Sequence, residues 1–305
     1  MEALVATVTT AIRACGECEK RVGIDVLVNG NSQLAGTLAR TLTRQDIAKK
    51  QPTLGIAVRV WSIQFGDKAN AWNEYIRIIW SGEEIAFFID GYVQLLPDSI
   101  RLLGPSVAGD STRLGGTGVP MIGKSATLIR EEMIRNGGFH GNFCCIKSQS
   151  LFEMKARQIR IPIGMYRTDS LMGAILNFDL DPEKNEWNPE RILVHPAATW
   201  EVKRKNWWSW ADQKGAFKRL LRQARGSLEN QAVKRLFTER RQLPERLPGT
   251  VRQLLAEWWA AQPRKSGCAR YRHPLSYWAW RDSQKPSPAT PTSTSAQLVA
   301  SLYVR

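Results

Sequence analysis

The chain has 305 residues, of which 43% are hydrophobic and 23% charged. This composition supports one or two domains with a buried core and excludes a disordered or collagen-like chain. The formal net charge of +15 suggests affinity for polyanions such as nucleotides, anionic lipids or nucleic acid, and does not choose among them.

The N-terminal part alternates helical apolar spacing with short β-branched runs. This rhythm predicts an α/β fold with a parallel sheet, in which ligands bind at the carboxyl ends of strands. The predicted elements are helices over 2–20, 34–44 and 68–80, and strands over 24–28, 56–63 and 85–89.

Glycine is concentrated in the middle of the chain, with nine glycines between Gly104 and Gly141. Their spacing matches neither a P-loop nor a dinucleotide-binding fingerprint. We therefore expect long loops here, with a mobile loop over 115–123.

Basic charge is concentrated near the C-terminus. Residues 201–285 hold 20 Lys and Arg against 7 Asp and Glu, a net of +13, and eight of the twelve tryptophans lie at or after Trp200. We therefore expect an α/β domain over 1–200 and a basic, Trp-rich helical region over 201–282, with helices over 207–237 and 251–261. Low apolar content in SQKPSPATPTSTSAQ predicts a flexible tail over 283–305.

Five cysteines and an N-terminus without a secretory signal predict reduced thiols in the cytoplasm. Cys15 and Cys18 have the spacing of a zinc or redox pair, but no second such pair exists, so we expect five unpaired thiols. No apolar stretch approaches the ~20 residues of a membrane-spanning helix.

The segment GDKANAWN from Gly66 to Asn73, followed by EIAFFIDGYV from Glu84 to Val93, places a lysine at a helix start and an aspartate at a strand end. With VLVNGNS at Val26, His140-Gly141-Asn142 and Tyr166-Arg167-Thr168-Asp169 in the same order, residues 24–200 resemble the family-2 inverting glycosyltransferases. The resemblance implies their GT-A nucleotide-sugar fold, a Rossmann-type, mixed but mainly parallel sheet flanked by helices.

The resemblance implies a hexosyltransferase-like enzyme and a role for each segment. Asp169 would be the catalytic base. The donor or its nucleotide would contact Asn29, Ser32, Lys68, Asn73, Asp90 and Gly91, and the acceptor would lie beside His140, Gly141 and Asn142. Sugar transfer needs such groups, because a hydroxyl must lose a proton and the departing diphosphate must be neutralised.

Two departures from the family pattern concern the donor side. The family usually has a second carboxylate two residues after the first to help hold Mn²⁺ or Mg²⁺, and this chain has Tyr92 there. Asp90 would then bind metal with another residue such as His195, or cationic side chains would replace the metal, or the chain is not a transferase.

The second departure is a missing first strand, since the chain opens with the helix that would follow it. Three explanations stay open: the natural start lies upstream, Thr7–Thr10 contributes something, or the donor pocket is incomplete.

Each candidate residue also has an ordinary structural interpretation. Asp90 would cap a turn, Lys68 and Asn73 would begin a solvated helix, and Asn29 and Ser32 would be turn residues. Asp169, His140 and His195 would be packed or loop residues without a chemical role.

The basic region has three interpretations: a helical appendage packed on the core, a peripheral membrane surface at the inner face of the membrane, or a nucleic-acid surface. In the second, Trp207, Trp208 and Trp210 would enter the lipid headgroups while Lys203, Arg204 and Lys205 meet anionic lipid. No motif frames a specific nucleic-acid site.

The leading hypothesis from the sequence is a glycosyltransferase that moves a sugar from a nucleotide donor to a saccharide or lipid-linked acceptor, with inversion. The alternatives are a non-catalytic binding or scaffold protein with the same fold, and a nucleic-acid-binding protein.

Overall fold

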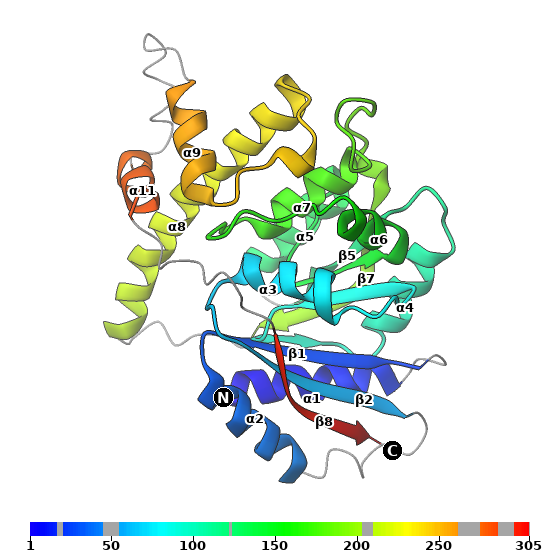
Figure 1. The fold of residues 1–305 in the computed structure, drawn as a ribbon. Coiled ribbons are helices and arrows are strands. Elements are labelled where there is room, and N and C mark those ends of the chain that lie inside the picture. The colour runs from blue at the N-terminus through cyan, green and yellow to red at the C-terminus, as the bar shows by residue number, and fades with distance from the viewer. Residues whose placement is uncertain are drawn as a thin grey trace.

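The computed structural model describes residues 1–16, 21–44, 55–121, 124–202, 210–261, 275–285 and 296–304. Helices and strands alternate over most of this length, and the described strands form two sheets (Figure 1). The fold is mixed α/β, as predicted. No helix in these ranges is both long and apolar enough to cross a membrane.

The smaller sheet has the order β1-β2-β8 and lies in the lower part of Figure 1. β1 (Gly23–Asn29) and β2 (Ile56–Ile63) run parallel. Both match predicted strands, because their β-branched residues fit a pleated, buried surface. Helix α2 (Ser32–Arg44) packs on this sheet through Leu38 and Leu42.

The prediction of a flexible tail over 283–305 is wrong for its last part, since Gln297–Val304 forms β8. β8 pairs antiparallel with β2 and leaves Leu298 and Tyr303 exposed. Backbone pairing with the edge of β2, which composition does not reveal, orders this segment. Residues 286–295 of the predicted tail lie outside the described part.

The larger sheet has the order β3-β6-β5-β7-β4. Its strands are β3 (Ile85–Ile89), β4 (Val93–Leu95), β5 (Gly115–Pro120), β6 (Phe143–Lys147) and β7 (Ile192–Val202). Only β5 and β7 run parallel here, and the pairs β3–β6, β5–β6 and β4–β7 are antiparallel. The sheets are mixed, as predicted, but they are not mainly parallel.

The glycine-rich stretch is not a set of long loops, and the expected mobile loop over 115–123 is wrong for Gly115–Pro120. The stretch that holds Gly104 to Gly141 includes the end of α4 (Ser99–Ala108), β5 and α5 (Lys124–Asn136). A Cβ on Gly116 would lie 2.6 Å from a Val107 methyl carbon, and one on Gly118 would lie 2.5 Å from the Ala198 carbonyl oxygen. These glycines therefore allow close packing within the sheet and against α4.

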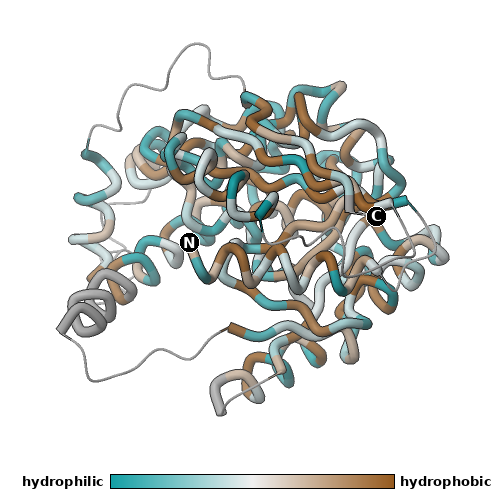
Figure 2. Tube along the Cα trace, turned by 90° about the horizontal axis from the view of Figure 1, so that it is seen from below, coloured by the Kyte–Doolittle hydropathy of each residue, from teal (hydrophilic) through white to brown (hydrophobic). Residues whose placement is uncertain are grey.

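Two hydrophobic clusters cover the two faces of the larger sheet. Adjacent residues of β6 belong to different clusters. Cys145 belongs to the cluster with α1 (Glu2–Gly16) and α4, and Cys144 belongs to the cluster on the other face. That second cluster includes α3 (Lys68–Glu74), the π-helical turn η2 (Tyr75–Ile79), α6 (Ser148–Ala156) and α7 (Thr168–Asn177). Hydrophobic stretches run through the body of the molecule, and hydrophilic ones lie mostly toward its edges (Figure 2).

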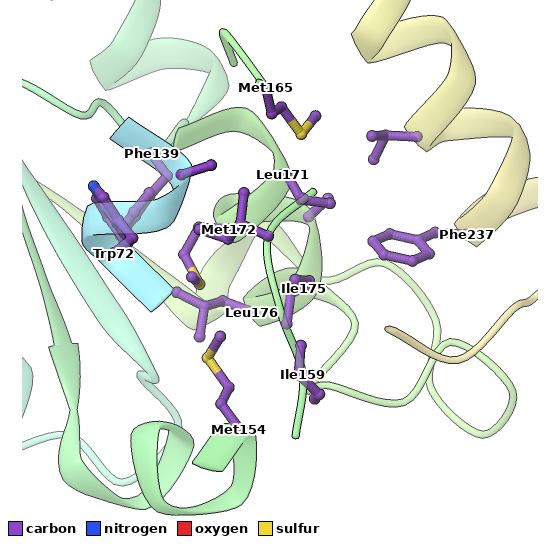
Figure 3. Packing of buried hydrophobic residues seen from close by; sticks show 14 of the residues in the cluster. Trp72, Phe139, Met154, Ile159, Met165, Leu171, Met172, Ile175, Leu176 and Phe237 are labelled. Carbon is purple, nitrogen blue, oxygen red and sulfur yellow. The ribbon is translucent and has the colours of Figure 1, made fainter. Parts of the chain in front are cut away.

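The described part of the basic region packs on the second cluster. It contains α8 (Trp210–Lys234), the π-helical turn η4 (Arg235–Glu239), the 3-10 turn η5 (Pro244–Arg246), α9 (Val251–Ala260) and α11 (Ser276–Ser283). Another 3-10 turn, η3 (Pro189–Arg191), comes directly before β7. Phe237 lies near Leu171 and Ile175 of α7 (Figure 3). This packing agrees with a helical appendage on the core. Residues 203–209, with Trp207 and Trp208, and the side chain of Trp210 lie outside the described part.

The two sheets are not joined to each other by a strand of the described chain. β1 pairs with β2 and β3 pairs with β6, so one edge of each strand faces the division between the sheets. Thr7–Thr10 lies inside α1 and does not supply a strand.

Candidate functional site

The carboxyl ends of β1, β2 and β3 meet at one end of the molecule. Asn29, the last residue of β1, donates from Nδ2 to the carbonyl oxygen of Asp67 over 3.1 Å. The next residue, Lys68, pairs with Asp90 directly after β3, with Nζ 2.6 Å from Oδ1. Ligands of α/β proteins bind at this end of the strands.

Lys68 is held at the start of α3 by a helix cap. Asp67 is the N-cap residue, and its Oδ1 accepts a hydrogen bond from the Asn70 backbone N–H over 2.8 Å. The Lys68 side chain is 38% exposed and that of Asp90 is 19% exposed. The ammonium group therefore forms a partly solvated ion pair that an incoming anion can reach.

Tyr92 stands where the sequence lacks a second carboxylate, and its hydroxyl group contacts Asp90. The hydroxyl oxygen lies 3.0 Å from Asp90 Oδ2 and 3.1 Å from Asn142 Oδ1, and its one proton is donated to either oxygen. Partial desolvation of its hydroxyl group, together with the charge of Asp90, raises the pKa of Tyr92 well above its usual value. Tyr92 therefore stays a neutral donor to Asp90.

Asp169 reaches the same place from the start of α7. Its Oδ2 accepts from the Gly141 N–H over 3.1 Å, and its Oδ1 accepts from the Ser170 N–H over 3.0 Å. A Cβ on Gly141 would lie 3.2 Å from Lys68 Nζ and 3.3 Å from Asp169 Oδ2. Gly141 thus leaves the space between the ammonium and this carboxylate clear, and Asp90 and Asp169 both lie near Lys68.

His140 and Asn142 flank Gly141. The His140 ring lies 5.3 Å from the Trp200 ring, and its Nδ1 accepts from the Asn142 N–H over 3.3 Å. Burial lowers the pKa of His140, and the nearby carboxylates of Asp169 and Asp90 oppose that shift. His140 is therefore a neutral, packed imidazole near the carboxylates at neutral pH.

Two predicted donor-binding residues, Asn73 and Ser32, do not join the group around Lys68. Asn73 is buried, and its amide group bonds at both ends to Ile161, donating to the carbonyl oxygen and accepting from the N–H, each over 2.9 Å. Its polar atoms are thus committed to the protein, so Asn73 anchors a loop. Ser32 is exposed in the first turn of α2, where Asn31 accepts from the Leu34 N–H.

The predicted metal ligands do not fit a divalent cation. His195 lies at an irregularity of β7, where its Nδ1 accepts from the N–H groups of Ala197 and Ala198 over 3.2 and 3.1 Å. Asp90 has the Lys68 ammonium on one oxygen and the Tyr92 hydroxyl on the other. In the described ranges, no three acidic, imidazole or thiol side chains gather around one point.

Glu229 is a site-supporting residue that the sequence analysis missed. Its side chain on α8 is 0% exposed and accepts from the N–H groups of Tyr166 and Arg167, over 3.0 and 2.8 Å, and from Arg225 Nε over 3.0 Å. Burial raises the pKa of Glu229, and the charge of Arg225 opposes that shift. Glu229 fixes the segment that leads directly into Asp169.

Asp67 supports both halves of the site. Besides capping α3, it accepts on Oδ2 from the Gly164 N–H over 3.0 Å, and Arg225 donates to the Gly164 carbonyl oxygen. One carboxylate thus links the helix of Lys68 to the loop before Asp169. A sequence signal existed, since an aspartate just before a helix is a common N-cap.

A cavity of about 1290 Å³ extends inward from this site. Its lining includes Asn29, Lys68, Asp90, Gly91 and Gly141 at the site, and it continues between β1 and β3 over apolar side chains. The site therefore combines a polar, charged end with a deep apolar wall, as small-molecule sites usually do.

No protein-family model matches this sequence, and no curated protein matches it either. Among solved structures, the chain is similar to the mannosyltransferase PcManGT from Pyrobaculum calidifontis in complex with GDP-Man and Mn²⁺. The TM-score is 0.49 and the sequence identity 14%, over 93% of each chain. A similarity this distant leaves open what the present chain binds.

Proposed function

We propose that this protein is a glycosyltransferase that moves a sugar from a nucleotide donor to a saccharide or lipid-linked acceptor, with inversion. One observation carries the proposal: Lys68 lies beside Asp90 and close to Asp169, at the carboxyl ends of β1 and β3 and at the end of a large cavity. An ammonium and two carboxylates here match the needs of sugar transfer.

Asp169 is the proposed general base. Two backbone N–H groups and the start of α7 support its negative charge, which a proton acceptor needs. The acceptor would lie beside His140, Gly141 and Asn142, so that its hydroxyl group reaches Asp169 and gives up its proton as it attacks the anomeric carbon of the sugar.

Lys68 is the proposed cation for the departing diphosphate. Charge develops on the leaving group as the glycosidic bond breaks, and a fixed ammonium stabilises it where water is partly excluded. Asp90 would orient Lys68 and accept hydrogen bonds from the sugar, with Gly91 allowing close approach. Asn29 would contact the nucleotide from the end of β1. No step requires a divalent cation, in keeping with the groups around Asp90.

A second candidate is a nucleotide-binding protein without catalysis. The feature that favours it is the pairing of both Asp90 oxygens, one with Lys68 and one with Tyr92. Such a protein would bind nucleoside diphosphates through Lys68 and would not turn over nucleotide sugars.

The test measures the turnover of a panel of nucleotide sugars through the release of the nucleoside diphosphate. We expect Asp169→Asn and Asp90→Asn to lower turnover at least about a hundredfold with the fold intact. Asp282→Asn is the matched control, because Asp282 also pairs with a lysine, Lys285, at 2.6 Å and lies on α11. Binding without turnover by the wild-type chain would favour the second candidate.

A further inference from the structure

A charged side chain without a partner lies just before the proposed base. Arg167 precedes Asp169 by two residues, and its Nε is buried with no hydrogen-bond partner in the described chain. No carboxylate of the described residues pairs with its guanidinium group, whereas Arg225 of α8 pairs with Glu229. Buried donors are normally satisfied, and a charged donor left without an acceptor is costly. An anionic ligand would supply the missing acceptor.

The fold holds Arg167 in place by contacts that do not neutralise it. Its backbone N–H donates to buried Glu229 over 2.8 Å, and its guanidinium carbon lies 5.7 Å from the centroid of the Tyr166 ring. A Cβ on Gly226 of α8 would lie 2.8 Å from Arg167 Nε and 3.0 Å from its Cγ. Gly226 therefore lets this side chain pack directly on the backbone of α8, with its positive charge unpaired.

Arg167 lies on the predicted acceptor side of the site. Burial lowers the pKa of His140, and the charge of Arg167 lowers it further. Charges act in this way only over short distances, so the guanidinium group lies near His140, one of the predicted acceptor residues. Neither Arg167 nor Asp169 lines the large cavity, which reaches the site beside Lys68 and Asp90. Arg167 is thus grouped with the acceptor residues and lies outside the cavity that the donor residues line.

The chemistry of the guanidinium group selects the ligand. Its planar fork donates two parallel hydrogen bonds to two oxygens of one phosphate or carboxylate, and a neutral hydroxyl group matches neither the fork nor the charge. A negatively charged acceptor would be repelled by Asp169, the carboxylate that must take its proton. A cation at Arg167 offsets this repulsion.

We propose that Arg167 binds an anionic group, a phosphate or a carboxylate, on the acceptor. This inference rests on the proposed function, because it names the class of acceptor that the same site takes. The anionic group would pair with the guanidinium group of Arg167, and a hydroxyl group of the same acceptor would reach Asp169. Arg167 would thereby orient the acceptor and exclude neutral ones of the same shape.

The test titrates the full chain with three methyl hexosides that differ only at C6, which carries a phosphate, a carboxylate or a hydroxyl group. We expect saturable binding of at least one anionic hexoside, and which one binds distinguishes a phosphate-bearing acceptor from a sugar acid. Arg167→Gln keeps the backbone bond to Glu229 and should lower that affinity about 10- to 100-fold, because hydrogen bonds to charged groups are the strong ones. Arg167→Lys, which keeps the charge without the fork, should recover part of the loss.

A second variant moves the guanidinium group without removing it. Gly226→Ala puts a methyl group where Arg167 Nε packs, so we expect about a tenfold loss of affinity for the anionic hexoside with α8 intact. Gly36→Ala on α2 is the matched control, because the nearest atom there would be 3.8 Å away. Arg241→Gln is the second control, since Arg241 also lies over an aromatic ring but pairs with Glu186. Both controls should bind as the wild type does.

Equal affinity of Arg167→Gln and wild type for the anionic hexosides would overturn the proposal, and so would anionic hexosides that bind no more tightly than the neutral one. Anion binding that Lys68→Gln abolishes and Arg167→Gln does not would place the anion beside the donor residues, which also overturns it. Circular dichroism checks that each variant is folded. No nucleotide sugar is present in these titrations, so a chain without turnover can still bind the anion through Arg167, and an active chain can fail this test.

Discussion

Two ion pairs near the site differ in solvent exposure. Lys68 and Asp90 are partly exposed beside a cavity, whereas Glu229 is 0% exposed and Arg225 holds it from the preceding turn of α8. The buried pair makes its remaining hydrogen bonds to backbone groups of the loop before Asp169. The partly exposed pair can exchange a partner for a ligand at low cost, while the buried pair cannot.

This difference separates two roles that sequence alone does not distinguish. A charged pair at the end of a cavity is suited to binding, and a charged pair inside a core is suited to fixing backbone. The following changes test that separation, beginning with the largest expected effect.

Glu229→Gln breaks the buried pair while keeping the shape of the side chain. Arg225 is left without its anion and two backbone donors lose a carboxylate, so we expect the free energy of unfolding to fall by about 3–5 kcal/mol. Urea denaturation followed by circular dichroism measures the change.

The matched control is Glu239→Gln. Glu239 also pairs with an arginine four residues before it, Arg235, but its side chain is 63% exposed. We expect a loss below about 1 kcal/mol. Similar losses in the two variants would mean that burial does not distinguish these pairs.

Asn73→Ala tests whether this amide anchors a loop or binds a ligand. The change leaves the carbonyl oxygen and N–H of Ile161 without their partner, and we expect a loss of about 1–3 kcal/mol in the free energy of unfolding. Affinity for nucleoside diphosphates should stay the same in calorimetric titration. A large loss of affinity in a fully folded variant would return Asn73 to the donor site.

His140→Gln tests the packed imidazole by its pH dependence. Because burial lowers the folded-state pKa of His140, the unfolded chain binds this proton at a higher pH than the folded protein does. The contribution of His140 is thus complete above the ordinary pKa of 6.5 and is lost as pH falls through it toward the folded value.

Denaturation of both proteins between pH 8 and pH 5 measures this effect. The stability of the wild type relative to His140→Gln should decrease as the pH falls, by less than the change expected for Asn73→Ala. A relative stability that is constant or rises toward pH 5 would show that the imidazole is not held neutral.

Much of the fold follows from local patterns in the sequence. The strands at 56–63 and 85–89 and the helices that begin at Lys68 and Val251 were predicted at their observed starts, because short apolar runs mark the strands and helical apolar spacing marks the helices. β5 was missed because glycine opposes strand formation, and here close packing by α4 and the neighbouring strands requires it.

The candidate site was predictable only in part. Lys68, Asp90, Gly141 and Asp169 come together as their order along the chain suggested. Glu229 carried no local signal, since a glutamate in a basic helix looks solvated until the partners in a distant loop are known. Tyr92 was noted as a missing carboxylate, and its hydroxyl bond to Asp90 depends on how the turn after β3 folds.

The most direct test of the account is calorimetric titration of nucleoside diphosphates in the presence of a chelator. We predict binding without a divalent cation, and a loss of about 10- to 100-fold in affinity in Lys68→Gln, since hydrogen bonds to a charged group contribute about 1.5–3 kcal/mol. Lys285→Gln, which removes the matched ammonium just after α11, should leave the affinity unchanged. Binding that requires Mn²⁺, or that is equal in Lys68→Gln and wild type, would contradict the account.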